Sequence, residues 1–253
     1  IMKAIAGLIA LVLLWSAPPA TAESAPPSGC EVPAYLLTSE SALNKVAAAV
    51  KTEGRLDIMV IGSRSATVVT PDGTGFPGRM EAALRERLPT VKVSVNVQLQ
   101  IKKTAADVTG ALAGILEGKQ PTLVIWQTGT VDAMRAVDPD DFRTAVDEGV
   151  TALRKHGADV VLMNLQYGPR METMITTAPY LDVMRVVAQQ HEVPLFDRFA
   201  IMHHWNEAGQ FDLFNNSRGI ELARRVHDCL GRALANFVIE AARIKPSELR
   251  TQQ

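Results

Sequence analysis

The sequence predicts an α/β fold: a three-layer, doubly wound, mostly parallel sheet of five strands with helices on both faces. Three observations lead to this fold class. From residue 55 onward, short β-branched runs alternate with longer amphipathic stretches. Three of the short runs are almost continuously apolar, which is typical of strands covered on both faces. The connections are mostly short, which favours one domain with right-handed crossovers over two domains.

The composition agrees with a globular chain and excludes several functions. Of the 253 residues, 47% are hydrophobic, and 26 Lys and Arg against 27 Asp and Glu give a net charge of −1. This balance offers no basic surface for nucleic acid, so no nucleic-acid partner is expected. Two cysteines exclude a structural zinc site built from Cys pairs. No glycine-rich phosphate loop follows the first strand, so neither a metal nor a cofactor is expected.

The first segment predicts an export signal. Met2 and Lys3 precede an apolar run over residues 4–15, and a small-residue cleavage pattern ends at Ala22. A membrane span would need about 20 apolar residues, whereas this run stops at Pro18. We therefore predict a signal peptide at 1–22, an extended lead-in at 23–36, and a periplasmic or secreted mature protein without a stable membrane span.

Export gives the two cysteines a structural interpretation. In an oxidising compartment, Cys30 and Cys229 are expected to form a disulfide that ties the N-terminal segment to the last helix. Two free buried thiols are the alternative.

Five strands are expected in the main domain, residues 37–244. Their ranges are 56–61, 91–97, 122–127, 159–165 and 194–196. The first, third and fourth are the near-continuous apolar runs. The second alternates apolar and polar residues, so one of its faces is expected to be wetted and the strand to lie at an edge of the sheet.

Six helices are expected around these strands. Their ranges are 39–51, 76–88, 105–117, 139–156, 171–191 and 217–242. The fourth has clear end signals, because Asp138 is a good N-cap, Pro139 suits the first turn and Gly157 follows the last one. Residues 245–253 are expected to form a frayed tail.

Candidate functional residues follow the strands, because ligands of such sheets bind outside the carboxyl ends of the strands. These candidates are Ser63, Arg64, Ser65, Lys102, Thr130, Asp132, Tyr167 and Arg170. They are expected to converge at one edge of the sheet.

Four segments, in their order and spacing, resemble the SGNH/GDSL hydrolase family. They are IMVIGSRS at 58–65, TAAD at 104–107, VIWQTGTVD at 124–132 and PLFDRF at 194–199. The resemblance implies a flavodoxin-like three-layer fold. It also implies an esterase or acylhydrolase activity on a small-molecule ester, since many members are secreted or periplasmic esterases.

The catalytic positions of that family carry other residues here. In the family, a serine two residues after the first-strand glycine attacks the ester; this position is Arg64, between Ser63 and Ser65. A glycine after the second strand and an asparagine after the third supply oxyanion donors. These two positions fall on Lys102 and Val131.

The late catalytic motif is altered as well. Asp-x-x-His provides the base and its orienting carboxylate in the family, whereas this chain has Asp212 and then Asn215. A serine hydroxyl is a poor nucleophile without a base, and the tetrahedral oxyanion needs preorganised donors. Activity by the family mechanism is therefore expected to be weak or absent.

The first functional hypothesis is an ester hydrolase with a rearranged site, acting for example on acylated glycans. Its nucleophile would be Ser65, with Ser63 behind it. Its base would be His204 or His203, oriented by Asp212. The family resemblance favours this hypothesis.

The second hypothesis is a non-catalytic binding or assembly module. Arg64, Lys102 and Arg170 follow three strands and are expected to gather at one end of the sheet. Guanidinium and ammonium groups suit a carboxylate or phosphate, so the ligand would be an anionic small molecule or glycan. The residues at the catalytic positions favour this hypothesis.

Overall fold

The computed structural model describes residues 30–67, 75–214 and 219–250. The predicted signal peptide at 1–22, residues 23–29 of the lead-in and Asn215 lie outside the described residues.

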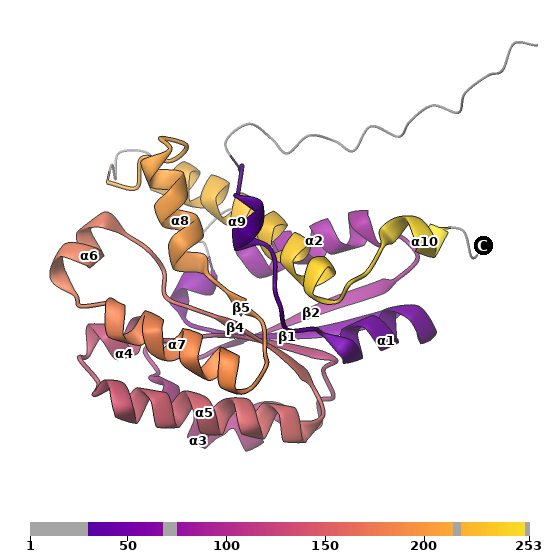
Figure 1. Ribbon diagram of the computed structural model, residues 1–253, viewed down its shortest axis with the longest axis horizontal. Coiled ribbons are helices and arrows are strands. Elements are labelled where there is room, and N and C mark those ends of the chain that lie inside the picture. Colours follow the sequence, from indigo (N-terminus) through magenta and orange to yellow (C-terminus); the bar gives the residue numbers. More distant parts are fainter. Residues whose placement is uncertain (1–29, 68–74, 215–218, 251–253) are drawn as a thin grey trace, which may run out of the picture.

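A five-stranded parallel sheet forms the centre of the molecule (Figure 1). Its strands are β1 (Arg55–Gly62), β2 (Lys92–Leu99), β3 (Leu123–Gln127), β4 (Asp159–Met163) and β5 (Leu195–Phe196). Their order is β2-β1-β3-β4-β5, and every neighbouring pair is parallel. The predicted doubly wound fold is therefore confirmed, and β2 is the edge strand that its alternating sequence predicted.

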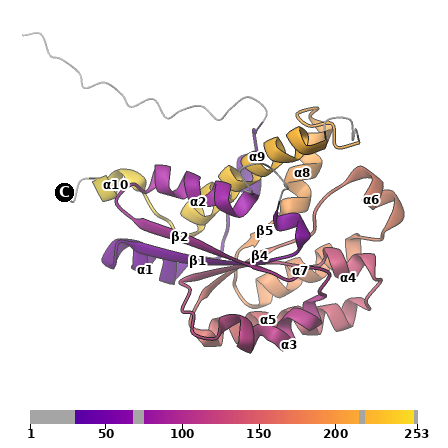
Figure 2. The ribbon, with the colours of Figure 1, turned by 180° about the vertical axis from the view of Figure 1, so that it is seen from behind.

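Helices cover both faces of the sheet, as Figures 1 and 2 show from opposite sides. One core contains side chains of α1 (Asn44–Thr52), α2 (Phe76–Arg87), α8 (Arg198–Glu207) and α9 (Gly219–Ala241). The other contains side chains of α3 (Ala105–Leu116), α5 (Pro139–His156) and α7 (Ala178–Gln190). The short elements are α4 (Thr130–Met134), α6 (Pro169–Met174), α10 (Pro246–Arg250) and the 3-10 turns Ala34–Leu36 and Arg64–Ala66.

The central strand β1 divides its side chains between the two cores. Leu56, Ile58 and Val60 pack into the core with α2 and α9. Met59 and Ile61 pack into the core with α3 and α5. This alternation follows from the two-residue period of a strand, and it explains why β1 is apolar throughout its middle.

The first helix begins five residues later than predicted, at Asn44 instead of residue 39. Asp159, at the start of β4, accepts hydrogen bonds from the backbone N–H groups of Lys45 and Val46 at 2.8 and 3.0 Å. A carboxylate distant in sequence thus caps the helix, and a local sequence signal does not reveal such a cap.

The predicted helix at 171–191 is two helices, α6 and α7. The break lies at residues 175–177, and Pro179 stands in the first turn of α7. Proline lacks an N–H and is tolerated in the first turn of a helix but not in its interior, so a new helix begins here. Helix α10 lies within the segment predicted as a frayed tail.

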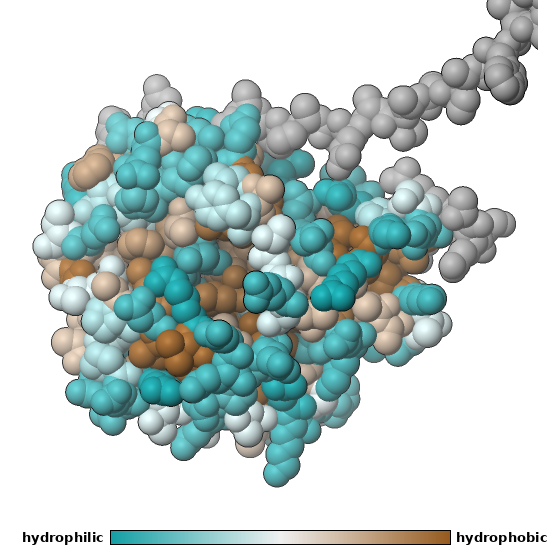
Figure 3. Space-filling view, viewed as in Figure 1, coloured by the Kyte–Doolittle hydropathy of each residue, from teal (hydrophilic) through white to brown (hydrophobic). Residues whose placement is uncertain are grey.

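The disulfide between Cys30 and Cys229 is present, with the two Cα atoms 5.2 Å apart and a sequence separation of 199. This confirms the predicted bridge between the N-terminal segment and α9, and it excludes the alternative of two free thiols. None of the described helices is long and apolar enough to cross a membrane. The face in Figure 3 is mostly hydrophilic, with apolar side chains in separate areas.

Candidate functional site

A cleft of about 790 Å³ lies at the carboxyl ends of β1, β3 and β4. It is bounded by the turn after β1, the loop after β2, helix α4 and the start of α9. The lining residues are Ser63, Arg64, Ser65, Thr67, Ile101, Lys102, Thr130, Val131, Met134, Arg135, Gln166, Gly219, Ile220, Ala223 and His227. This is the edge at which ligands bind in sheets of this type.

The turn after β1 brings two serine hydroxyls to the floor of the cleft. The Oγ atoms of Ser63 and Ser65 lie 3.1 Å apart. Gln127, the last residue of β3, donates from Nε2 to both of them, at 2.5 Å to Ser65 and 3.3 Å to Ser63. Gly62 leaves room for this arrangement, because an added Cβ would lie 2.9 Å from Oε1 of Gln127 and would displace that side chain.

Below the serines lies a buried cation, Arg198, which is 1% exposed. Its guanidinium donates to Oγ of Ser65 at 3.2 Å and to Oε1 of Gln166 at 3.1 Å, and it lies 5.7 Å from the ring centroid of Phe76. None of its hydrogen-bond partners in the described ranges is a carboxylate. Burial lowers the pKa of Arg198 to about 9, so the group is still charged at neutral pH.

The loop after β2 keeps a backbone conformation that favours glycine. Lys102, which occupies the position of the family's oxyanion glycine, has φ of 60°. A side chain in the left-handed region is strained, so this position of the loop has a backbone shape that would suit glycine. The ammonium group of Lys102 is exposed at the cleft.

His227 on α9 also lines the cleft, which no motif in the sequence predicted. Its Nδ1 accepts a hydrogen bond from the backbone N–H of Phe76 at 2.9 Å. Burial, together with the positive charges of Arg198 and Arg79, lowers the pKa of His227 to about 3. The imidazole is therefore neutral at ordinary pH, and because Nδ1 is an acceptor, its hydrogen is on Nε2.

Three residues of the hypothetical hydrolase are not among the lining residues of the cleft. His203 packs edge-on against Tyr167 and lies within 3.2 Å of Glu207. His204 is half-buried in the same helix, α8. Asp212 lines a separate cavity of about 380 Å³. The structure thus brings Ser63 and Ser65 together but does not place the predicted bases or Asp212 with them.

Of the predicted ligand-binding residues, Arg64, Lys102 and Thr130 line the cleft. The other three have different surroundings. Tyr167 is buried, which raises its pKa, and Arg170 donates to the carbonyl of Phe214 at 3.5 Å. The carboxylate of Asp132 accepts a hydrogen bond at 2.9 Å from the backbone N–H of Ala105, which is the first residue of α3.

Burial of Asp132, which is 1% exposed, raises its pKa, and backbone hydrogen bonds oppose this shift. The geometry gives Asp132 a structural role, because it satisfies an N–H at the start of α3 that has no intrahelical partner.

Arg198 follows β5 but was not among the residues predicted for the site. Helix α8 buries positions 198, 201, 202 and 205, which is the spacing of one helical face. An arginine at the first of these positions interrupts the apolar pattern, and so the helix was not predicted. The N-cap Asp197, whose side chain accepts from the N–H of Ala200 at 2.9 Å, is the signal that could have revealed it.

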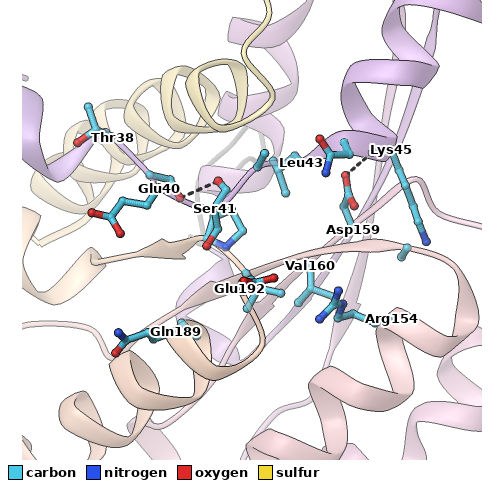
Figure 4. A pocket seen from close by; sticks show the side chains of 17 residues that line it. Thr38, Glu40, Ser41, Leu43, Lys45, Arg154, Asp159, Val160, Gln189 and Glu192 are labelled. Atoms are coloured by element: carbon cyan, nitrogen blue, oxygen red, sulfur yellow. Dashed lines mark hydrogen bonds between the residues drawn. The ribbon is translucent and has the colours of Figure 1, made fainter.

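A second cavity, of about 950 Å³, lies at the opposite edge of the sheet (Figure 4). Two charged side chains of this cavity make hydrogen bonds to the backbone. Asp159 caps α1, as Figure 4 shows for Lys45, and Arg154 donates to the carbonyl of His191 at 2.7 Å. No group of His, Cys, Asp or Glu side chains in the described parts of the chain could hold a metal ion.

Comparison with known proteins agrees with this fold. The chain matches the non-GDSL lipase-like family over residues 29–244. No curated protein matches the sequence significantly.

Several solved structures of hydrolases share the fold. A lipase/acylhydrolase from Enterococcus faecalis has a TM-score of 0.59 at 17% identity, covering 76% of this chain and 98% of its own. A catalytic mutant of an acetylxylan esterase from Geobacillus stearothermophilus has a TM-score of 0.59 at 18% identity, covering 75% and 97%. A psychrotrophic esterase from Pseudoalteromonas has a TM-score of 0.54 at 16% identity, covering 72% and 97%. The predicted SGNH-like fold is thus confirmed, and the chain belongs to the non-GDSL lipase-like family.

Proposed function

We propose that this protein is an exported member of its family that binds an anionic ligand in the cleft and does not hydrolyse esters. The apolar start of the sequence and the disulfide support export to the periplasm or the medium. The family's nucleophile position is Arg64, whose side chain is exposed at the cleft.

The surroundings of Ser65 carry the proposal. Its hydroxyl oxygen accepts hydrogen bonds from Gln127 and from the cation Arg198, which draw electron density away from the atom that would attack. The histidine that shares the cleft, His227, already has its hydrogen on the nitrogen that does not bind Phe76. It cannot accept the serine proton, and the other described residues that line the cleft include no histidine, aspartate or glutamate that could act as the base.

Labelling with a fluorophosphonate tests the absence of hydrolysis. We expect no stoichiometric labelling of the wild-type protein and no hydrolysis of a p-nitrophenyl ester above the buffer rate. Labelling that disappears in Ser65→Ala or Ser63→Ala would instead establish the ester hydrolase. In that case, the rate should rise through about pH 6–7 if His203 or His204 is the base, and should fall in the alanine variants of those two residues.

Calorimetric titration with anionic sugars and phosphates tests ligand binding. We expect binding by the wild-type protein and weaker binding by Arg64→Ala, because a guanidinium forms charge-assisted hydrogen bonds with an oxyanion. Arg143→Ala is the matched control, since Arg143 is an exposed arginine on α5, outside the cleft. The proposal fails if no anion binds, or if Arg64→Ala binds as tightly as the wild type.

A further inference from the structure

Most of the polar side chains at the floor of the cleft are left with hydrogen-bond donors for a ligand. Arg198 has only donors, and it donates to Oγ of Ser65 and to Oε1 of Gln166. Because Oε1 of Gln166 is used by Arg198, the amide NH₂ of this side chain is left for the cleft. Ser63 and Ser65 both accept from Gln127, so their mutual hydrogen bond leaves one hydroxyl hydrogen to donate outward.

Two further groups of the cleft have the same polarity. Oγ1 of Thr130 accepts from the backbone N–H of Gln166 at 3.3 Å, which leaves its hydroxyl hydrogen for the cleft. The Nε2 of His227 carries a hydrogen, because Nδ1 accepts from Phe76. The polar floor thus consists mainly of hydrogen-bond donors, contributed by the turn after β1, α4, the segment after β4 and α9. The exception is Thr67, whose hydroxyl donates to the carbonyl of Arg64 at 3.0 Å and so leaves an acceptor.

The charged side chains at the rim of the cleft are all positive, which suits the same kind of ligand as the donors of the floor. Arg64, Lys102 and Arg135 line the cleft with exposed side chains. None of the described lining residues is an aspartate or glutamate. The carboxylate of Asp107, outside the lining, interacts electrostatically with Arg135 and has Thr104 as its hydrogen-bond partner. A neutral sugar, whose hydroxyls need acceptors as well as donors, matches such a surface poorly.

One wall of the cleft is aliphatic and exposed. Ile101, Met134 and Ile220 are 44%, 64% and 57% exposed, and all three line the cleft together with Val131 and Ala223. Large apolar side chains that gather around a concavity mark a binding surface, whereas isolated ones do not. Apart from His227, the described lining residues include no aromatic ring on which a sugar could stack.

From this combination we infer that the ligand is an aliphatic oxyanion, that is, a phosphate or carboxylate head group on an alkyl chain. The head group accepts hydrogen bonds from the serine turn, Gln166 and the rim cations, and the chain lies on Ile101, Met134 and Ile220. The inference rests on the proposed function, because it requires a cleft that binds without hydrolysis, and it specifies the ligand class.

Calorimetry with a matched ligand series tests the inference. The ligands are inorganic phosphate, butyl phosphate, octyl phosphate, octanoate and the neutral octyl glucoside, each below its micellar concentration. Each methylene that leaves water should improve affinity about fourfold, so octyl phosphate, with four more methylenes, should bind up to about 200-fold more tightly than butyl phosphate. Octanoate should bind if a carboxylate head suffices, and octyl glucoside should bind far more weakly than either octyl anion.

The outcomes separate this inference from the proposed function. If phosphate and butyl phosphate bind but octyl phosphate binds no more tightly, the aliphatic part is wrong and anion binding stands. Equal binding of octyl glucoside and octyl phosphate overturns the anionic head group. If no anion binds, the proposed function and the inference both fail.

Paired variants locate the alkyl chain. Met134→Ser should weaken octyl phosphate several-fold and leave inorganic phosphate unchanged. Met174→Ser is the matched control, because Met174 is 82% exposed on α6 and does not line the cleft, and it should change neither ligand. Equal effects of the two substitutions on octyl phosphate would exclude the proposed wall.

Discussion

Single buried residues determine the polarity of the cleft. Arg198 contributes a positive charge that no carboxylate among its described partners neutralises. Because it donates to the oxygen atoms of Ser65 and Gln166, it leaves their hydrogen atoms for other partners. His227 contributes a neutral donor because the backbone of Phe76 fixes its tautomer. Both residues act through hydrogen bonds made deep in the core, where an unsatisfied partner would be costly.

Protonation of His227 should destabilise the fold in acid. Its pKa is about 3 in the folded chain and about 6.5 when unfolded, so between these values the unfolded chain binds more protons. The stability is complete near pH 7 and falls as the pH drops below 6.5. Between pH 7 and pH 4, the free energy of unfolding should fall by about 3 kcal/mol more in the wild type than in His227→Asn.

Denaturant titrations at pH 7 and pH 4 measure this difference. Asparagine keeps an acceptor for the N–H of Phe76 but does not titrate, so it is a conservative control. Burial raises the pKa values of Asp132 and Asp159, which act in the opposite direction but are common to both proteins. Parallel losses in the two proteins would mean that His227 does not resist protonation.

At the scale of elements, the strands were predictable because burial on both faces leaves a simple signal. The apolar runs of β1, β3 and β4 and the alternating run of β2 gave the fold class and the edge strand. Helix α8 was not predictable, because a buried arginine occupies a position of its apolar face. The site was predictable only in part: its loops follow from the topology, whereas the contribution of α9 depends on tertiary packing.

The close packing of α9 on α2 holds the cleft residues of α9 in place, and this packing depends on Gly231. A Cβ at this position would lie 2.7 Å from the backbone N of Met80 and 2.8 Å from the carbonyl oxygen of Phe76. Gly231→Ala should therefore cost about 2–3 kcal/mol of unfolding free energy. Gly114→Ala on α3 is the matched control, since no atom lies within 4 Å of its added Cβ, and it should stabilise by about 0.5–1 kcal/mol.

Urea unfolding of the two variants measures these values. Because α9 carries Ile220 and His227, Gly231→Ala should also weaken octyl phosphate binding at temperatures where the variant is still folded. A stability equal to that of Gly114→Ala would show that the two helices can separate at little cost.

At the scale of the whole molecule, charge is balanced overall but unevenly placed. The chain has a net charge of −1, while the described residues that line the cleft include three cations and no carboxylate. Attraction of an anion is therefore local, and exposed charges are screened by salt over a Debye length of about 10 Å at 0.1 M.

Salt should separate the two halves of the proposed ligand. Raising sodium chloride from 50 to 500 mM should weaken octyl phosphate several-fold, because the rim cations are exposed. The ratio of octyl to butyl phosphate affinities should stay constant or rise, since salt does not weaken apolar burial. Calorimetry at both salt concentrations measures this, and an affinity for octyl phosphate that is independent of salt would contradict a role of the rim cations.

The bridge between Cys30 and Cys229 has a mechanical consequence. It closes a covalent ring around β1 to β5, so tension applied at the two chain ends passes through the sulfur atoms and bypasses the sheet. In a single-molecule pulling experiment, the oxidised protein should extend only by the residues outside the ring. After reduction, the segment that joins the cysteines, which are 199 positions apart, should add about 700 Å of contour length. Equal extension of the oxidised and reduced proteins would contradict this prediction. If the prediction holds, the disulfide protects the sheet and its cleft from force applied along the chain.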